Sequence, residues 1–156
     1  MKYDGVRPET IVMLVERMHL HRIIQMGAEH SADVLNGERL SYLGYSVARW
    51  DGDTLVVDTT NFTDRTPFRG PPATTRGDIQ SSAGLHVVER FTRVSADRIL
   101  YQFTVDDPNT WTSPWSAEIP MIATKGPLYE YACHEANYAV GNILRGARME
   151  DAGPAR

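Results

Sequence analysis

The sequence predicts an all-β protein: an antiparallel up-and-down meander of about eight strands with a short C-terminal helix. We expect either a lipocalin-like barrel or a curved open sheet. Short β-rich runs recur along the chain and are joined by tight turns. One run alternates strictly, which places Ile99, Tyr101, Phe103 and Val105 on one face of a strand. No helical stretch separates the runs, as the crossovers of a parallel sheet would require.

The expected strands follow one another along most of the chain. In order, they are residues 10–17, 20–26, 44–50, 53–59, 85–93, 98–106, 114–123 and 127–133. Asp51-Gly52 lies between the third and fourth, and this dipeptide favours the positive φ angles of a tight hairpin turn. Pro120 indicates that the seventh run is an edge strand or contains a bulge, because proline cannot donate to a strand ladder.

The rest of the chain is a long loop and a helical tail. The loop covers residues 60–83, and loops of this length are often functional. Residues 137–147 have helical character, with Ala139, Ile143 and Leu144 on one side, and residues 148–156 resemble a frayed end. We therefore expect a single domain over residues 1–156, with its strands within residues 10–136.

Composition excludes several classes of protein. Lys and Arg number 16 against 20 Asp and Glu, and the basic residues are scattered, so we expect no nucleic-acid partner. Cys133 is the only cysteine, which rules out an intrachain disulfide and a cysteine-based zinc site. No apolar run reaches the length of about 18 residues that a transmembrane helix needs, so we expect no membrane partner.

Two long motifs carry a resemblance to a known group of proteins. Residues 50–59 fit W-[DE]-G-D-T-L-V-V-[DE]-T, and residues 129–138 fit Y-E-Y-A-C-H-E-x-N-Y. With the shorter segments 85–91 and 104–108, they make the chain resemble a family of uncharacterised, mostly exported bacterial proteins over residues 10–148. The resemblance implies no activity, since none is established for the family.

The resemblance also bears on localisation. Family members are usually longer and carry a signal peptide and a further N-terminal segment. Residues 1–5 of this chain lack an apolar signal core, which predicts a cytoplasmic protein as the sequence is written. If the chain is a truncated family member that lacks its upstream segment, the expectation becomes periplasmic or exported.

Acid–base chemistry has four candidate residues, Glu89, Asp106, Glu130 and His134. Glu89 and Arg90 point to opposite faces of a strand, so one of them faces the interior and needs a partner. Glu118 and Glu130 are candidate partners for Arg90. Asp106 and Asp107 are also typical of a strand-ending turn before Pro108, and Cys133 and His134 point apart if they lie in a strand.

Aromatic residues are numerous on the predicted strands. Most are expected in the core, and some would line a cavity for an apolar or aromatic small molecule. The candidate ligand-binding residues are Arg90, Tyr101, Trp115 and Tyr131.

His19 and His21 form the sharpest local pattern in the sequence. Two residues apart on a strand, both imidazoles would face the same side and could share a divalent metal ion. If residues 18–19 form a turn, the pair separates. No other cofactor is expected.

These observations leave three hypotheses about function. The first is a module that binds a small apolar or aromatic ligand in the barrel. The second is a small barrel enzyme, a hydrolase or lyase, that uses interior carboxylates and a histidine. The third is a structural or assembly domain of a longer exported protein, with homo-oligomer formation through an exposed sheet edge.

Overall fold

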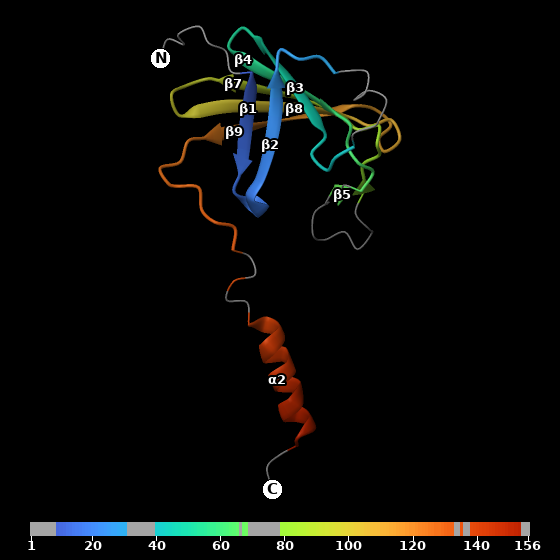
Figure 1. Cartoon of the computed structure of the whole chain (residues 1–156), viewed down its shortest axis with the longest axis vertical. Coiled ribbons are helices and arrows are strands. Elements are labelled where there is room, and N and C mark those ends of the chain that lie inside the picture. The colour runs from blue at the N-terminus through green and yellow to red at the C-terminus, as the bar shows by residue number, and fades with distance from the viewer. Residues whose placement is uncertain are drawn as a thin grey trace. The chain divides into compact units, whose positions relative to one another are not determined.

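The computed structural model describes residues 9–30, 40–65, 67–68, 79–132, 135 and 138–153. Its main feature is a seven-stranded sheet in the order β1-β2-β3-β4-β7-β8-β9 (Figure 1). The strands are β1 (Thr10–Val15), β2 (Leu20–Met26), β3 (Tyr45–Asp51), β4 (Thr54–Thr60), β7 (His86–Arg93), β8 (Arg98–Asp106) and β9 (Trp115–Ile122). A second sheet pairs β5 (Pro67–Phe68) with β6 (Ile79–Gln80). The described helices are a 3-10 turn, η1 (Arg17–His19), and the α-helix α2 (Ala139–Asp151).

The predicted all-β class with a short C-terminal helix is confirmed, and the sheet curls into a half-barrel. The expected all-antiparallel meander is wrong at one position, because β2 pairs with β3 in parallel. A tight hairpin forces antiparallel strands, whereas a parallel pair needs a crossover of about a dozen residues or more. The segment between β2 and β3, residues 27–44, is long enough for such a connection.

We call the side of the main sheet that bears the core cluster Ile24, Ala48, Leu55 and Val57 the inner face. Ile11, Met13, Met26 and Phe91 pack against this cluster. The strand register aligns inner-face residues in rows that run across the sheet. One row is Trp50–Leu55–Phe91–Tyr101–Ile119, and the next is Ala48–Val57–Glu89–Phe103–Ala117. Alternation along each strand sends the intervening residues to the outer face.

The β3–β4 hairpin forms next to the predicted dipeptide, but its two turn residues are Gly52 and Asp53, because Asp51 is the last residue of β3 and pairs with Thr54. Gly52 has a φ of 59°, the left-handed conformation that glycine adopts without steric cost. β4 contributes three of the most completely buried residues, Val56, Val57 and Thr59, at 1%, 0% and 1% exposure. β4 lies in the middle of the sheet and is therefore covered along most of its length.

The chain divides into two compact units, which are described separately. The first contains Met1–Leu14 and His21–Gly126, and the second contains Val15–Leu20 and Pro127–Arg156. In the second unit, the predicted strand 127–133 is absent over its described residues, 127–132. The backbone N–H of Tyr129 donates to Oε2 of Glu16 at 3.4 Å, and that of Tyr131 donates to Nε2 of His19 at 2.9 Å. Side chains, not a neighbouring strand, thus satisfy these donors.

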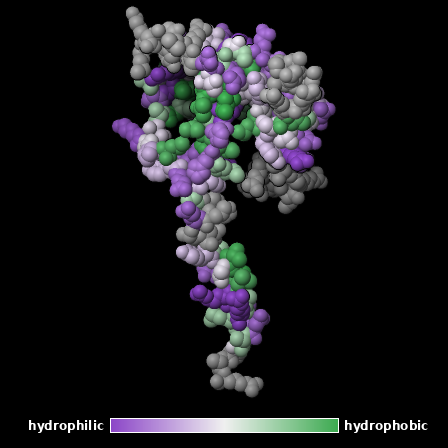
Figure 2. Space-filling view, viewed as in Figure 1, coloured by the Kyte–Doolittle hydropathy of each residue, from purple (hydrophilic) through white to green (hydrophobic). Residues whose placement is uncertain are grey.

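Helix α2 extends further than the predicted 137–147 and begins two residues later. All its described residues are exposed, including Val140, Ile143 and Leu144. Hydrophobic residues gather along one side of α2 and hydrophilic residues along the other (Figure 2). No helix among the described residues is both long enough and apolar enough to cross a membrane. β1 and β9 are the edges of the main sheet, and oligomer formation through an edge stays a prediction.

Candidate functional site

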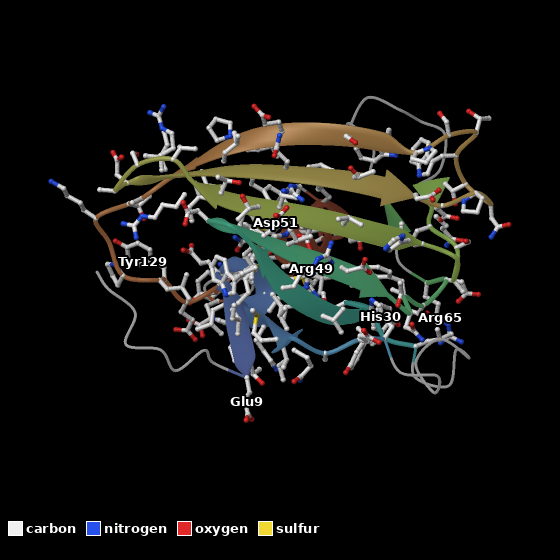
Figure 3. The ribbon with its side chains drawn as sticks, turned by 90° about the horizontal axis from the view of Figure 1, so that it is seen from above. Glu9, His30, Arg49, Asp51, Arg65 and Tyr129 are labelled. Atoms are coloured by element: carbon white, nitrogen blue, oxygen red, sulfur yellow. The ribbon has the colours of Figure 1, made fainter. Side chains whose placement is uncertain are left out.

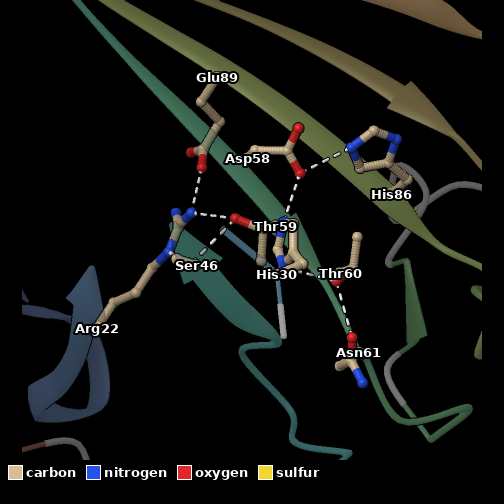
Figure 4. A network of polar contacts seen from close by, with 9 residues as sticks. All are labelled: Arg22, His30, Ser46, Asp58, Thr59, Thr60, Asn61, His86 and Glu89. Atoms are coloured by element: carbon tan, nitrogen blue, oxygen red, sulfur yellow. Dashed lines mark hydrogen bonds and ion pairs between the residues drawn. The ribbon is translucent and has the colours of Figure 1, made fainter. Parts of the chain in front are cut away.

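Five polar side chains form a hydrogen-bonded group on the inner face, which we call the inner cluster: Arg22, Ser46, Thr59, Glu89 and Tyr101. Figure 4 shows the first four of these residues. Arg22 comes from β2, Ser46 from β3, Thr59 from β4, Glu89 from β7 and Tyr101 from β8. Ser46 and Thr59 face each other in the β3–β4 register, with their oxygens 3.0 Å apart. The cluster therefore ties five strands together through side chains alone.

Glu89 is the centre of the inner cluster. Its side chain is 7% exposed, and its two oxygens accept from different donors. Nη2 of Arg22 forms an ion pair with Oε2, and the hydroxyl of Tyr101 donates to Oε1 at 2.8 Å. Burial, and then the negative charge of Glu89, raises the pKa of Tyr101, so its hydroxyl keeps its proton and remains a donor.

Arg22 connects the charged and the neutral parts of the inner cluster. Nε donates to Oγ of Ser46 at 2.8 Å, and Nη2 also donates to Oγ1 of Thr59 at 2.7 Å. Nη1 has no hydrogen-bond partner among the described residues. Since the guanidinium is paired with Glu89, the cluster has no net charge and retains one donor.

Aromatic rings adjoin the inner cluster along β7, β8 and β9. Tyr101 stacks between Phe91 and Phe103, with ring centroids 4.8 and 5.4 Å away. Phe103 makes an edge contact with Trp115 at 5.7 Å, and Trp115 makes one with Trp111 at 5.8 Å. Aromatic pairs at these separations add to the stability that their burial provides.

A second polar group, the outer cluster, lies on the opposite face of β4 and β7. Oδ1 of Asp58 is 2.9 Å from Nε2 of His30 and 3.0 Å from Nε2 of His86 (Figure 4). The hydroxyl of Thr60 lies 3.3 Å from Nδ1 of His30 and donates to Oδ1 of Asn61 at 2.8 Å. Asp58 and Thr59 are neighbours in one strand and point apart, so the two clusters use opposite faces of β4.

Close backbone contacts position the residues around the outer cluster. Gly44 has a φ of 67°, and a Cβ atom there would lie 2.6 Å from the carbonyl oxygen of Thr60. Asn61 also adopts a left-handed conformation, with a φ of 61°, which asparagine tolerates better than most residues. The backbone N–H of Ser41 donates to the carbonyl of Asn61 at 3.0 Å, which holds the segment before β3 against the end of β4.

Three predicted site residues meet on the inner face. Glu89 and Tyr101 are hydrogen-bonded, and Trp115 belongs to the adjoining aromatic group. Arg90 instead lies on the outer face, as the alternation required, and pairs with Asp51 at 2.9 Å. Neither Glu118 nor Glu130, the partners that the sequence suggested, pairs with Arg90, and Glu118 instead accepts a hydrogen bond from Gln102.

Asp106 and Asp107 differ in role, as their opposite directions on the strand imply. Asp106 lies directly across from His86 in the β7–β8 register. Asp107 is 1% exposed and accepts bonds from the backbone and hydroxyl of Ser82, from the backbone of Asn109 and from the hydroxyl of Thr110. Asp107 is thus the structural turn residue that the Asp-Pro pattern indicates.

The other candidate residues lie elsewhere. Glu130 and Tyr131 are exposed in an irregular segment of the second unit. His134 and its neighbour Cys133 lie outside the described residues. His19 belongs to η1 and His21 to β2, so they do not share one strand. Across the described part of the chain, no three His, Cys, Asp or Glu side chains converge as a metal site would require.

Sequence reasoning did not pair Arg22 with Glu89 and assigned no role to Asp58. Arg22 and Glu89 are 67 positions apart, and no local pattern pairs residues at such a distance. Asp58 offered a weak signal, because a carboxylate within the apolar run 55–57 of a central strand needs a partner.

Comparisons of the chain with protein-family models, with curated proteins and with solved structures found no match.

Proposed function

We propose that this protein binds a small, uncharged aromatic or apolar molecule on the inner face of its half-barrel. The observation that carries the proposal is the row Trp50–Leu55–Phe91–Tyr101–Ile119, which crosses five strands without a charged residue. Trp50 and Ile119, at the two ends of this row, are 43% and 47% exposed. Leu55, within the row, belongs to the buried core cluster, so the apolar surface that is open to solvent lies at the ends of the row. Exposed apolar surface of this kind is typical of a binding site.

The exposed apolar surface continues beyond this row. Ile99 and Met121 face each other in the β8–β9 register, and they are 38% and 43% exposed. Both lie on the inner face by strand alternation. A flat aromatic molecule would remove these side chains from water, and burial of apolar area stabilises a complex by about 25 cal/mol per Å².

The inner cluster supports a ligand without net charge. Arg22 and Glu89 neutralise each other, so a charged ligand would lack a counter-ion there. Nη1 of Arg22 is the remaining donor, and a carbonyl or ether oxygen would accept its hydrogen bond. We therefore assign the ligand to aromatic or apolar molecules that carry one hydrogen-bond acceptor.

The outer face has different chemistry. A surface pocket of about 410 Å³ there is lined by Val88, Phe103 and Ala117 and by five polar side chains, Arg90, Gln102, Thr104, Ser116 and Glu118. The polar side chains bond to one another or to neighbours, as in Gln102–Glu118 at 2.9 Å and Thr104–Ser116 at 2.8 Å. Rows of paired polar side chains are usual on the solvent-facing side of an antiparallel sheet, so we place the apolar ligand on the inner face.

A fluorescence titration tests this proposal. The probe is Prodan, a naphthalene ketone whose emission shifts to the blue in an apolar site, added to the full chain. We expect saturable binding that Ile119→Asp weakens about tenfold, because a buried charge without a partner is costly. Ile122→Asp is the matched control, since Ile122 is 61% exposed and belongs to the outer face of the same strand. Absence of saturable binding, or equal weakening by both substitutions, would overturn the proposal.

A further inference from the structure

A separate pocket adjoins the outer cluster. It has a volume of about 340 Å³, and its wall comprises Leu40, Thr60, Asn61, Ala83, Gly84, Leu85 and His86. Pockets of this size hold small organic molecules, usually through an apolar wall and a few polar groups. Here the wall is largely apolar, and among its described residues His86 is the only one with a titratable side chain.

The hydrogen bonds determine which nitrogen of His86 can serve a ligand. An ionised carboxylate only accepts, so both imidazoles that contact Oδ1 of Asp58 donate through Nε2. In the neutral ring of His86, the proton therefore lies on Nε2 and the lone pair on Nδ1. Nδ1 has no hydrogen-bond partner among the described residues.

His30 and His86 differ although they share one carboxylate oxygen. His30 is 15% exposed and contacts Asp58 through one nitrogen and Thr60 through the other. His86 is 40% exposed and contacts a protein side chain through Nε2 alone. His30 thus helps to hold Asp58, Asp58 orients His86, and His86 keeps one nitrogen for a ligand. Asp106, opposite His86 in the strand register, adds a second carboxylate nearby.

We propose that this pocket is a second binding site, distinct from the inner face, for a small neutral molecule with an acidic hydroxyl group, such as a phenol. His86 accepts the proton of that hydroxyl group, and Asp58 positions the imidazole of His86. The ligand hydroxyl donates to Nδ1, and the proton then moves to that nitrogen. The O–H bonding pair stays on the ligand oxygen, which becomes a phenolate. The imidazolium formed keeps its Nε2–H bond to Asp58, whose negative charge stabilises it.

The test uses 4-nitrophenol, because its phenolate absorbs visible light and its neutral form does not. We expect the full chain to produce saturable phenolate absorbance at a pH where the free probe is mostly neutral. His86→Gln should abolish it, and Asp58→Asn should reduce it about tenfold, the effect expected for a lost bond to a charged partner. Asp51→Asn, which changes a carboxylate paired with Arg90, should leave it unchanged.

Two further measurements distinguish binding in this pocket from binding on the inner face, and a direct effect of the substitutions from a folding defect. Ile119→Asp should not alter the phenolate signal, because that side chain lies on the other face of the sheet. In the unsubstituted protein, imidazole nitrogen NMR should show the Nε2–H tautomer of His86, and Asp58→Asn should diminish its population. A phenolate signal that survives His86→Gln, no saturable signal, or an Nδ1–H tautomer would overturn the proposal.

Discussion

The hydroxyl of Tyr101 donates a 2.8 Å hydrogen bond to the carboxylate of Glu89, and the same carboxylate pairs with Arg22. One buried acid thus accepts from β2 and from β8, strands that are not neighbours in the sheet. This arrangement places a neutral polar group beside the aromatic row of the inner face. It links the stability of the half-barrel to the surface that we propose for the ligand.

Glu89→Gln should destabilise the protein strongly. The substitution leaves the Arg22 guanidinium without its counter-ion, and breaking a mostly buried pair costs about 3 kcal/mol. Glu118→Gln is the matched control, because Glu118 makes an exposed contact with Gln102 and its loss should change stability by less than about 0.5 kcal/mol. Urea unfolding measures both. Equal stability of the two variants would show that the inner cluster contributes nothing to folding.

Tyr101→Phe should cost about 1 kcal/mol near neutral pH, because Glu89 loses one donor. The pKa of Tyr101 is raised in the folded state, so the folded protein retains its proton where the unfolded chain has lost it. The stabilisation by the Tyr101 hydroxyl is therefore complete below the unfolded value of 10.0 and is lost as pH rises above it. Urea unfolding across this range should show the difference between the two proteins shrinking. A difference that grows with pH would contradict this account.

Asp107→Asn should destabilise the protein by about 1–3 kcal/mol, because an amide cannot accept all the bonds that Asp107 receives. Burial raises the pKa of Asp107, but the hydrogen bonds from Ser82, Thr110 and Asn109 outweigh it and the net shift is downward. The stabilisation is therefore present above the unfolded value of 3.8 and disappears as pH falls through the lower folded value. Thermal unfolding at a series of acidic pH values should show the two proteins converging. Asp97→Asn, in an exposed turn, should show only a small change throughout.

The glycines at positions 44 and 52 provide a matched pair. Both have positive φ, but a Cβ at Gly44 would meet the Thr60 carbonyl oxygen at 2.6 Å and Cγ2 of Thr59 at 2.7 Å, whereas one at Gly52 would meet nothing within 4 Å. Gly52→Ala should therefore cost about 1 kcal/mol through backbone strain alone. Gly44→Ala should cost more than about 2 kcal/mol, because backbone must also move. Thermal unfolding would contradict this geometry if the two costs were the same.

Sequence reasoning predicted those features of the fold that depend on local pattern. The alternation of Ile99, Tyr101, Phe103 and Val105 predicted the inner face of β8, and Asp51-Gly52 predicted the β3–β4 turn to within one residue. Glu89 and Tyr101 were candidate site residues, but their bond to each other and to Arg22 depends on how three strands align. Such long-range register has no local signal.

The wrong predictions also concern contacts between segments that are far apart in the sequence. Residues 127–132 have strand composition, but a strand forms only where a neighbour satisfies its backbone, and here the side chains of Glu16 and His19 do so. The parallel pairing of β2 with β3 joins strands that are separated by 18 residues in the sequence, and turn chemistry does not determine how strands so far apart pair. Arg90 pairs with Asp51, which lies at the turn end of β3, away from His30 (Figure 3).

Contacts between bound Prodan and isoleucine methyl groups, measured by NMR on the full chain, test the central claim most directly. Isoleucines lie on both faces of the main sheet and therefore report which face the ligand covers. We expect nuclear Overhauser effects from Prodan to the methyl groups of Ile99 and Ile119 on the inner face, and none to those of Ile23 and Ile122 on the outer face. Effects confined to Ile23 or Ile122 would contradict the inner-face site, as would a bound probe without contacts to Ile99 and Ile119.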